Sequence, residues 1–516
     1  MRRLILLASL VLVVAGWPAG DAIAAANVQV FPPPQGIGDR GVSGEEINLY
    51  LTVHNQALES DDPAPDAAND VVVTIPVPPG SQLIKVNVPQ PWTCTSTADA
   101  IVCRAAQLRS MPVGDFDTLT LTIRLSDQAA GTLSYTGTAE AANSPRWTFE
   151  ANYFVYGRIT VTTTNDSGAG SLREAIARMN ASAPGTPWNI AFALPPSSVF
   201  EPVTPLPVIT ACSDIVINVG GASTASIEAP RPYALSGARV SSGSGLELRP
   251  NCPAALAGGF YLTGLAIGGF PVDGIEIRPA RAPYNVRLDG VFIGTDMTGT
   301  IARPNGWRGV VISADSNVSI ERSILSANGR SGLFAWQAGP VSINDSFIGI
   351  GSDRRPLGNG ASGAFIRAGS LRISGTVVAH NAHWGVSALP GAYMLAVYSN
   401  SFYSNGVLGI DWGVDFQTLH STITSPAAPV ITSAIYDPVL NKTTVRGTIT
   451  VDTVLLCDRN LIYVYSSGSS RTRHGFVEGE RVEASSQGFG TRNAPGTYEW
   501  TAVISGDLRG RVVTAL

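Results

Sequence analysis

The chain has 516 residues, of which 14% are charged and 44% are hydrophobic, and its formal net charge is −5. So few charges, together with 54 glycines and 35 prolines, argue against helical bundles and coiled coils and favour a β-rich, turn-rich protein. The length allows about two to four domains. Because no basic patch accompanies the small net charge, we expect no nucleic-acid partner.

The beginning of the chain predicts a secretory signal peptide over residues 1–26. Arg2 and Arg3 precede an apolar run at 4–17, and small residues typical of a cleavage site follow at 22–26. The run is too short for a stable membrane span, and an uncleaved anchor is the alternative. No later run reaches about 18 apolar residues. We therefore expect a secreted protein, extracellular or at a bacterial cell surface, with no transmembrane segment in the mature chain.

The region 27–156 predicts an all-β sandwich. Apolar and polar residues alternate at 47–53, which is the period of a half-buried strand. The segment Leu51–Asn55, followed later by Cys94 and Cys103, resembles the immunoglobulin-like repeat found in many exported bacterial proteins. This resemblance implies an Ig-like β-sandwich.

The next segment predicts a short amphipathic helix. Ser171 is a plausible N-cap, because Glu174 follows three residues later as in a capping box. Four apolar residues then share one helical face: Leu172, Ala175, Ile176 and Met179. The stretch Ile159–Ile176 is similar to the CSLREA-type segment that opens β-helix domains of secreted bacterial proteins. The leading Cys of that motif is Gly170 here, so any role of that thiol is lost.

The central region repeats with a period of 20 to 30 residues. The pattern Asn-x-x-x-Gly-apolar starts at Asn305, Asn328, Asn359, Asn381 and Asn405, so successive positions differ by 23, 31, 22 and 24. Such a period, with several short strands in each repeat, is typical of a β-solenoid. We expect the asparagines to stack as a ladder and the glycines to supply positive φ angles where the coils bend.

A second pattern with the same period predicts the core. Pairs of apolar residues separated by one residue recur through the repeats, and we expect all of them to point into one core. These residues are Val286, Leu288, Val318, Ile320, Val341, Ile343, Leu371, Ile373, Leu395 and Val397. Together the patterns predict an all-β protein whose region 157–425 is a right-handed parallel β-helix, resembling the pectate-lyase-like solenoid, with an N-terminal capping helix.

The remaining region, 426–516, predicts a second, smaller Ig-like β-sandwich. Short apolar strands at 429–431, 444–449 and 462–466 support it. Similar proteins usually continue beyond the position of Leu516. Two alternatives follow: the last strand ends the protein, or the C-terminus is truncated.

Five cysteines in an exported chain predict disulfides. We expect the bonds Cys94–Cys103 and Cys212–Cys252. Cys457 remains, either as a buried thiol or with a partner on another chain. We expect no cofactor.

No metal site is expected. His380 and His383 lie on one predicted turn, but no third ligand accompanies them, so a turn or core position is favoured for both.

A catalytic site has one weak candidate in the repeats. Asp289 and Glu321 occupy equivalent positions after their core strands, and Arg322 and Asp345 occupy the next column. On one wall these groups would suit a polysaccharide lyase or a glycoside hydrolase acting on an acidic polysaccharide. The alternative is a solvated turn with an Arg322–Asp345 ion pair, which contributes little to stability.

The favoured function is non-catalytic binding of a glycan or of a macromolecular partner. Trp307 and Trp384 fall inside the Asn-x-x-x-Gly turns, where side chains should point outward. Exposed aromatic rings on a long, flat wall stack well on sugars and on partner surfaces. The candidate partners are therefore a polysaccharide or a cell-surface glycan. The alternative is that each Trp folds over a neighbouring loop.

Overall fold

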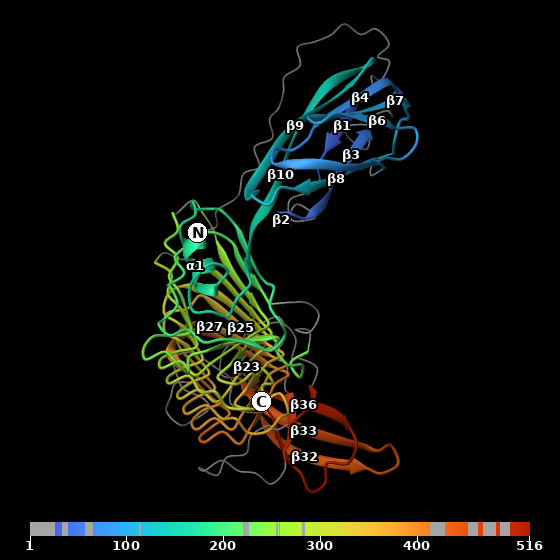
Figure 1. Ribbon diagram of the computed structural model, residues 1–516. Helices are drawn as coiled ribbons and strands as arrows, with labels where there is room; N and C mark the ends of the chain where they lie inside the picture. Colours follow the sequence, from blue (N-terminus) through green and yellow to red (C-terminus); the bar gives the residue numbers. More distant parts are fainter. Residues whose placement is uncertain are drawn as a thin grey trace. The chain divides into compact units, whose positions relative to one another are not determined.

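The computed structural model describes residues 26–32, 40–56, 65–112, 115–219, 226–253, 256, 258–280, 284–412, 429–451, 463–467, 481–485 and 496–515. The chain divides into two compact units, Met1–Val155 and Tyr156–Leu516 (Figure 1). The predicted signal peptide lies almost wholly outside the described residues. Among the described residues, no helix is long and apolar enough to cross a membrane.

The first unit consists of antiparallel sheets around one apolar core. One sheet has the order β1 (Val28–Phe31), β3 (Glu46–Asn55), β8 (Asp117–Leu125) and β5 (Ser81–Asn87). The other has the order β6 (Thr93–Ser96), β7 (Ala100–Leu108), β4 (Ala68–Pro76), β9 (Gly131–Ala141) and β10 (Ser144–Val161), and β2 (Arg40–Val42) pairs with β10. Both sheets contribute buried residues to the same core, as the alternation predicts. The Ig-like assignment itself stays a prediction.

The second unit contains three parallel sheets through which the chain passes in turn. Sheet 1 comprises β15 (Leu246–Leu248), β18 (Ile275–Ile277), β21 (Val310–Ile312), β24 (Leu333–Ala335), the first parts of β27 (Ala364–Ser374) and β29 (Val386–Tyr398), and β31 (Ile410–Trp412). Sheet 2 comprises the end of β10, then β11 (Trp188–Phe192), β13 (Ile215–Asn218), β16 (Gly259–Thr263), β19 (Tyr284–Asp289), β22 (Ser316–Glu321), β25 (Pro340–Asn344) and the later parts of β27 and β29. Sheet 3 comprises β12 (Ser198–Phe200), β14 (Tyr233–Ser236), β17 (Leu265–Gly268), β20 (Phe292–Ile293), β23 (Ile324–Leu325), β26 (Phe347–Ile348), β28 (Val377–Ala379) and β30 (Ser401–Tyr403).

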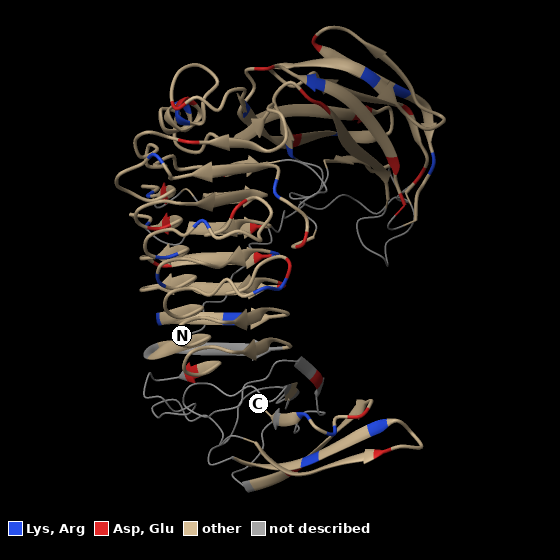
Figure 2. Ribbon diagram, turned by 60° about the horizontal axis from the view of Figure 1, so that its bottom comes forward, with Lys and Arg blue, Asp and Glu red and all other residues tan. Residues whose placement is uncertain are grey.

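This architecture is a parallel β-helix, and Figure 2 shows its coils stacked one above the other. From β15 to β30 each coil adds one strand, or part of a strand, to each sheet, so like positions of successive repeats lie about 4.8 Å apart. The predicted fold class is therefore confirmed for this region, while its right hand and the limits 157–425 stay predictions. Stacking makes every outward or inward position of a coil part of a column.

The predicted core column is buried. Eight of its ten residues, from Val286 to Ile373, are at most 2% exposed. The side chains of Leu395 and Val397 lie outside the described residues, although their backbones pair with Leu371 and Ile373. One continuous apolar cluster fills the β-helix.

The predicted asparagine ladder forms at the turn between sheets 3 and 1. Each side-chain Nδ2 donates to the Oδ1 of the next asparagine, from Asn305 through Asn328, Asn359 and Asn381 to Asn405, over 3.0, 3.0, 2.8 and 2.9 Å. All five are buried. Because an amide side chain both donates and accepts, each asparagine supplies the hydrogen-bond acceptor for the asparagine of the coil before it.

The predicted positive φ angles do occur at glycines where the coils bend, but the five glycines of the Asn-x-x-x-Gly motif are not among them. A Cβ on Gly309 would instead lie 2.5 Å from the carbonyl oxygen of Gly332, and a Cβ on Gly385 would lie 2.4 Å from that of Gly409. These positions are glycine because neighbouring coils approach closely there. The left-handed φ angles occur elsewhere, for example at Gly290 and Gly294.

The helix α1 (Leu172–Asn180) lies at the start of the β-helix. The Ser171 Oγ accepts the backbone N–H of Glu174 over 3.2 Å, and the predicted apolar face is the buried one. Gly170 has a φ of 76°, and a Cβ there would lie 2.2 Å from the Thr162 Oγ1. Glycine therefore suits this position better than the Cys of the resembling motif.

The C-terminal region contains two small antiparallel sheets. One has the order β32 (Val430–Asp437), β33 (Lys442–Val451) and β36 (Gly496–Ser505), and the other has the order β35 (Arg481–Ser485), β34 (Tyr463–Ser467) and β37 (Val512–Ala515). Val445, Val464 and Trp500 belong to their common apolar core. Cys457 lies outside the described residues, and the Ig-like assignment of 426–516 stays a prediction.

Both cysteine pairs named from the sequence are bonded. Cys94 and Cys103 lie opposite each other on β6 and β7, with Cα atoms 4.0 Å apart. Cys212 and Cys252 bond at the start of the β-helix, with Cα atoms 5.0 Å apart.

Candidate functional site

A groove of about 520 Å³ lies on the outer face of sheet 1, over β18, β21 and β24 and beside the turns that precede them. The strand register creates it. The central residues of these short strands face outward, and successive strands place Glu276, Val311 and Phe334 directly in line. Glu247 precedes them on β15 and Phe365 follows on β27. The column therefore changes from carboxylates to aromatic rings along the axis.

Aromatic rings form much of the groove wall. Trp307 and Trp336 both line it and are 46% and 45% exposed. The Phe334 ring stacks on Phe365 with centroids 5.3 Å apart and planes 6° apart, and Trp336 stacks on Phe334 at 6.0 Å. Because Phe334 stacks on the next coil and Trp336 stacks on Phe334, the orientation of these two rings is fixed before any ligand arrives.

The carboxylates of the groove are held by arginines. Glu276 forms ion pairs with Arg278 and, at 3.6 Å, with Arg249, which also pairs with Glu247 at 3.0 Å. These partners fix the orientation of the acids along the groove.

Asp273, which also lines the groove, is almost fully buried. Its Oδ1 accepts the backbone N–H of Arg308 over 2.9 Å. Burial raises the pKa of Asp273, and the hydrogen bond from Arg308 opposes that rise.

Three guanidinium groups stack on the aromatic rings. Arg308 lies over Phe334 at 4.1 Å, Arg330 over Trp307 at 5.0 Å and Arg367 over Trp336 at 3.6 Å, measured to the ring centroids. None of these arginines forms an ion pair with a carboxylate in the described part of the chain. Cation–π contacts hold these guanidinium groups without using their N–H donors, which can still bond to other acceptors.

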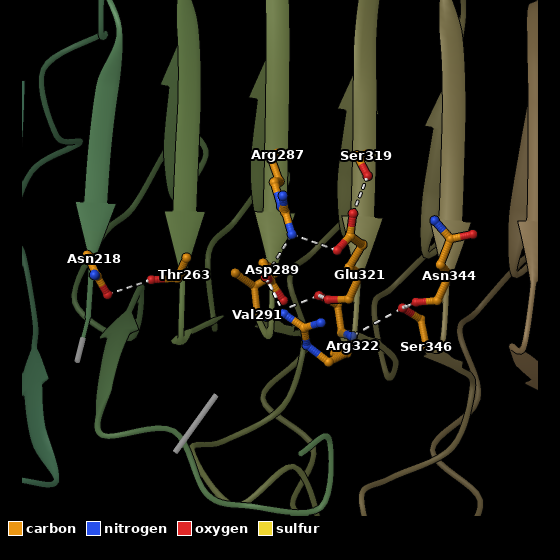
Figure 3. A network of polar contacts seen from close by, with 11 residues as sticks. Asn218, Thr263, Arg287, Asp289, Val291, Ser319, Glu321, Arg322, Asn344 and Ser346 are labelled. Atoms are coloured by element: carbon orange, nitrogen blue, oxygen red, sulfur yellow. Dashed lines mark hydrogen bonds and ion pairs between the residues drawn. The ribbon is translucent and has the colours of Figure 1, made fainter. Parts of the chain in front are cut away.

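The predicted catalytic candidates lie at a different place, the corner between sheets 2 and 3 (Figure 3). Asp289 and Glu321 pair in register, as their equivalent positions suggest. Arg287 Nη2 lies 2.8 Å from Glu321 Oε2 and 3.4 Å from Asp289 Oδ2, and Arg322 also pairs with Asp289. We call Arg287, Asp289, Glu321 and Arg322 the corner network. It does not line the groove on sheet 1.

Asp345 stands apart from this network. Arg322 and Asp345 do share a column, and both have left-handed φ angles, of 46° and 49°. However, Arg322 pairs with Asp289, and Asp345 is exposed with no ion pair to a described residue. The structure therefore replaces the expected Arg322–Asp345 pair by one to the preceding coil.

A buried arginine that the sequence did not single out lies near the corner network. Arg231 is 2% exposed, stacks over Phe292 at 4.1 Å and donates from Nη2 to the Ser226 carbonyl over 2.7 Å. Burial lowers the pKa of Arg231 to about 10, although the charge of Asp289 opposes this.

The two predicted tryptophans are placed differently. Trp307 lies on the groove, whereas Trp384 is half-buried outside its lining and packs edge-on against His383. The motif explains the difference, because Trp307 stands two residues after its asparagine and Trp384 stands three residues after. In the repeat, Trp384 therefore corresponds to Arg308.

His380 is half-buried against Tyr403, and burial lowers its pKa. Among the described residues, no group of three or more His, Cys, Asp or Glu side chains is placed to hold a metal ion.

Sequence reasoning missed most of the groove. Phe334 and Asp273 come from different positions of two repeats, and no single motif contains them. The available signal was the register itself. Once the sheet-1 strands are aligned by their motif glycines, Glu276, Val311 and Phe334 form one outward column.

Comparison with known proteins identifies no family. No protein-family model and no curated protein matches the chain. The A-module of a mannuronan C-5 epimerase from Azotobacter vinelandii is 13% identical and covers 52% of this chain and 91% of its own, with a TM-score of 0.22. A cohesin module from a Clostridium perfringens family 33 glycoside hydrolase is 9% identical and covers 26% of this chain and 97% of its own, with a TM-score of 0.19. At these scores the likenesses carry no argument about function, so the fold is taken from the chain's own sheets.

Proposed function

We propose that this chain is a secreted or cell-surface β-helix protein that binds a glycan, without catalysis, through the groove on sheet 1. The observation that carries the proposal is the pair of exposed tryptophans, Trp307 and Trp336, on one groove of about 520 Å³. Isolated exposed apolar residues are common on proteins, but ordered rings around a concave, partly polar surface mark a binding site.

The groove chemistry suits a sugar. The faces of Trp307 and Trp336 offer apolar platforms for the C–H face of a pyranose ring. Glu276, Arg278 and Arg249 offer oriented acceptors and donors for hydroxyl groups beside those platforms. Two disulfides, together with the N-terminal signal pattern, support the secreted location.

A glycan array followed by calorimetry on the purified protein tests the proposal. We expect the double variant W307A/W336A to lose at least tenfold in affinity for the best glycan and to keep its thermal midpoint, since both rings are half exposed. W384A and F116A serve as controls and should bind normally. Phe116 matches Trp307 in exposure at 46%.

Two results would overturn the proposal: no glycan binding at all, or unchanged binding in W307A/W336A. A uronate-release and reducing-end assay on the same glycans adds a further check. Turnover that is lost in D289N or E321Q would favour the polysaccharide lyase or glycoside hydrolase instead, with its site at the corner network.

A further inference from the structure

The balance of charge changes along the groove and its continuation on sheet 1. At the β15–β18 end, Arg249 and Arg278 are neutralised by Glu247 and Glu276. At the β21–β27 end, none of the three stacked arginines forms an ion pair with a carboxylate among the described residues. We call Arg308, Arg330 and Arg367, with the rings Trp307, Phe334 and Trp336 beneath them, the arginine–aromatic strip.

The strip carries positive charge on a protein whose formal net charge is −5, and of its three arginines Arg308 interacts with the opposite charge of Asp273. Arg330 and Arg367 are exposed, and Arg308 is half-buried in the groove wall. Burial lowers the pKa of Arg308 although Asp273 is near, yet a guanidinium remains charged at neutral pH. Each guanidinium carbon lies 3.6–5.0 Å from the centroid of its ring, and Arg330 and Arg367 are exposed, so a ligand on the surface can reach their N–H donors.

We infer that the glycan bound in the groove is anionic, and that its acidic groups meet Arg308, Arg330 and Arg367. This inference rests on the proposed function and specifies its ligand class. The planar fork of arginine matches carboxylate and sulfate oxygens with two parallel hydrogen bonds, which a neutral hydroxyl cannot accept equally well. The rings below keep the sugar plane against the wall. Because the strip crosses β21, β24 and β27, the polymer runs along the axis of the β-helix.

The test compares an acidic oligosaccharide with its neutral ester and with two other polyanions. Affinities are measured by calorimetry for oligogalacturonate, for its fully methyl-esterified form, for a heparin-derived oligosaccharide and for a single-stranded oligonucleotide. We expect at least one anionic glycan to bind tenfold or more tightly than the neutral ester, with an affinity that falls as salt rises. The tighter of the uronate and sulfated ligands identifies the acidic group.

The variant R308Q/R330Q/R367Q should reduce the affinity for the anionic glycan at least tenfold, to that of the ester, while ester binding is unchanged. Because Arg308 is half-buried, R330Q/R367Q repeats the test with exposed residues only. The matched control R104Q/R124Q/R146Q removes three exposed charges from the first unit and should bind like the unmodified protein.

The outcomes separate the two proposals. Equal binding of ester and acid, or an unchanged affinity in both arginine variants, overturns the anionic ligand and leaves glycan binding in place. Oligonucleotide binding as tight as that of the anionic glycan overturns the sugar preference of the strip. No binding of any glycan overturns the proposed function itself.

Discussion

The corner network and the arginine–aromatic strip both contain arginines of the same β-helix, yet these arginines have different partners. At the corner, Arg287 and Arg322 find Asp289 and Glu321 on neighbouring coils. On sheet 1, Arg308, Arg330 and Arg367 lie over aromatic rings instead. Columns of charge in a solenoid are therefore structural where neighbouring coils supply the counter-charge, and they are available for ligands where the neighbours supply rings.

The largest effect on both regions should come from the ladder that fixes the coils. Asn328 is 1% exposed, accepts from Asn305 and donates to Asn359 and to the Ile293 carbonyl. Asn328→Ala leaves several of these buried groups unpaired, so we expect about 3 kcal/mol of destabilisation in denaturant unfolding.

This turn also carries Arg330, so glycan affinity should fall together with stability in N328A. Asn317→Ala, which removes an exposed ladder bond of 3.0 Å to Asn285, is the control and should change stability by less than about 0.5 kcal/mol. A similar loss of unfolding free energy in both variants would contradict the structural role of the buried ladder.

The ladder also shows how far the sequence could predict the structure. The period of Asn-x-x-x-Gly identified the coils, the core column and the stacked amides, because identical residues at one period must meet in a solenoid. The groove has no such signature, since Val311, Phe334 and Trp336 are unlike residues. The 31-residue step before Asn359 also separates Phe334 from Phe365, the ring on which it stacks. The charged column of Asp289 and Glu321 was visible in the sequence. The position of the groove was not, because a concave surface depends on side-chain packing that no spacing encodes.

Removing the central acid of the corner network sharpens the contrast between the two regions. The Asp289 side chain is 10% exposed, whereas those of Arg322 and Arg287 are 37% and 48% exposed. Asp289→Ala leaves both arginines without this partner, and solvent screening of the exposed partners limits the expected cost to about 1–2 kcal/mol. Glycan affinity should stay within twofold of the unmodified protein by calorimetry. Lost binding with an intact thermal midpoint would place the site at the corner rather than in the groove.

The buried acid of the groove predicts a pH effect of known sign. Burial raises the pKa of Asp273 above its ordinary value of 3.8, so the folded state binds the proton more tightly than the unfolded state. The stability contributed by the protonated form is complete below 3.8 and is lost as pH rises through the raised folded pKa. Asp273→Asn retains an Oδ1 acceptor for the Arg308 N–H.

Thermal midpoints measured across the acidic range should therefore decline less toward neutral pH in D273N than in the unmodified protein. At neutral pH the variant should be as stable or more stable. A lower midpoint for D273N at neutral pH only would show that the carboxylate stabilises the fold, contrary to this prediction.

The smallest effect should come from the exposed side of the corner network. Arg287 and Glu321 approach to 2.8 Å, but their side chains are 48% and 23% exposed, so water competes for both. Glu321→Gln keeps the shape and an acceptor for Ser319, whose Oγ lies 3.0 Å from Oε1. We expect about 0.5 kcal/mol of destabilisation at low ionic strength, shrinking toward zero in high salt as the pair is screened. Denaturant unfolding at two salt concentrations measures this directly. A salt-independent loss of several kcal/mol would mean that neither water nor salt screens the charges of the corner network. The contrast between the corner network and the arginine–aromatic strip would then be wrong.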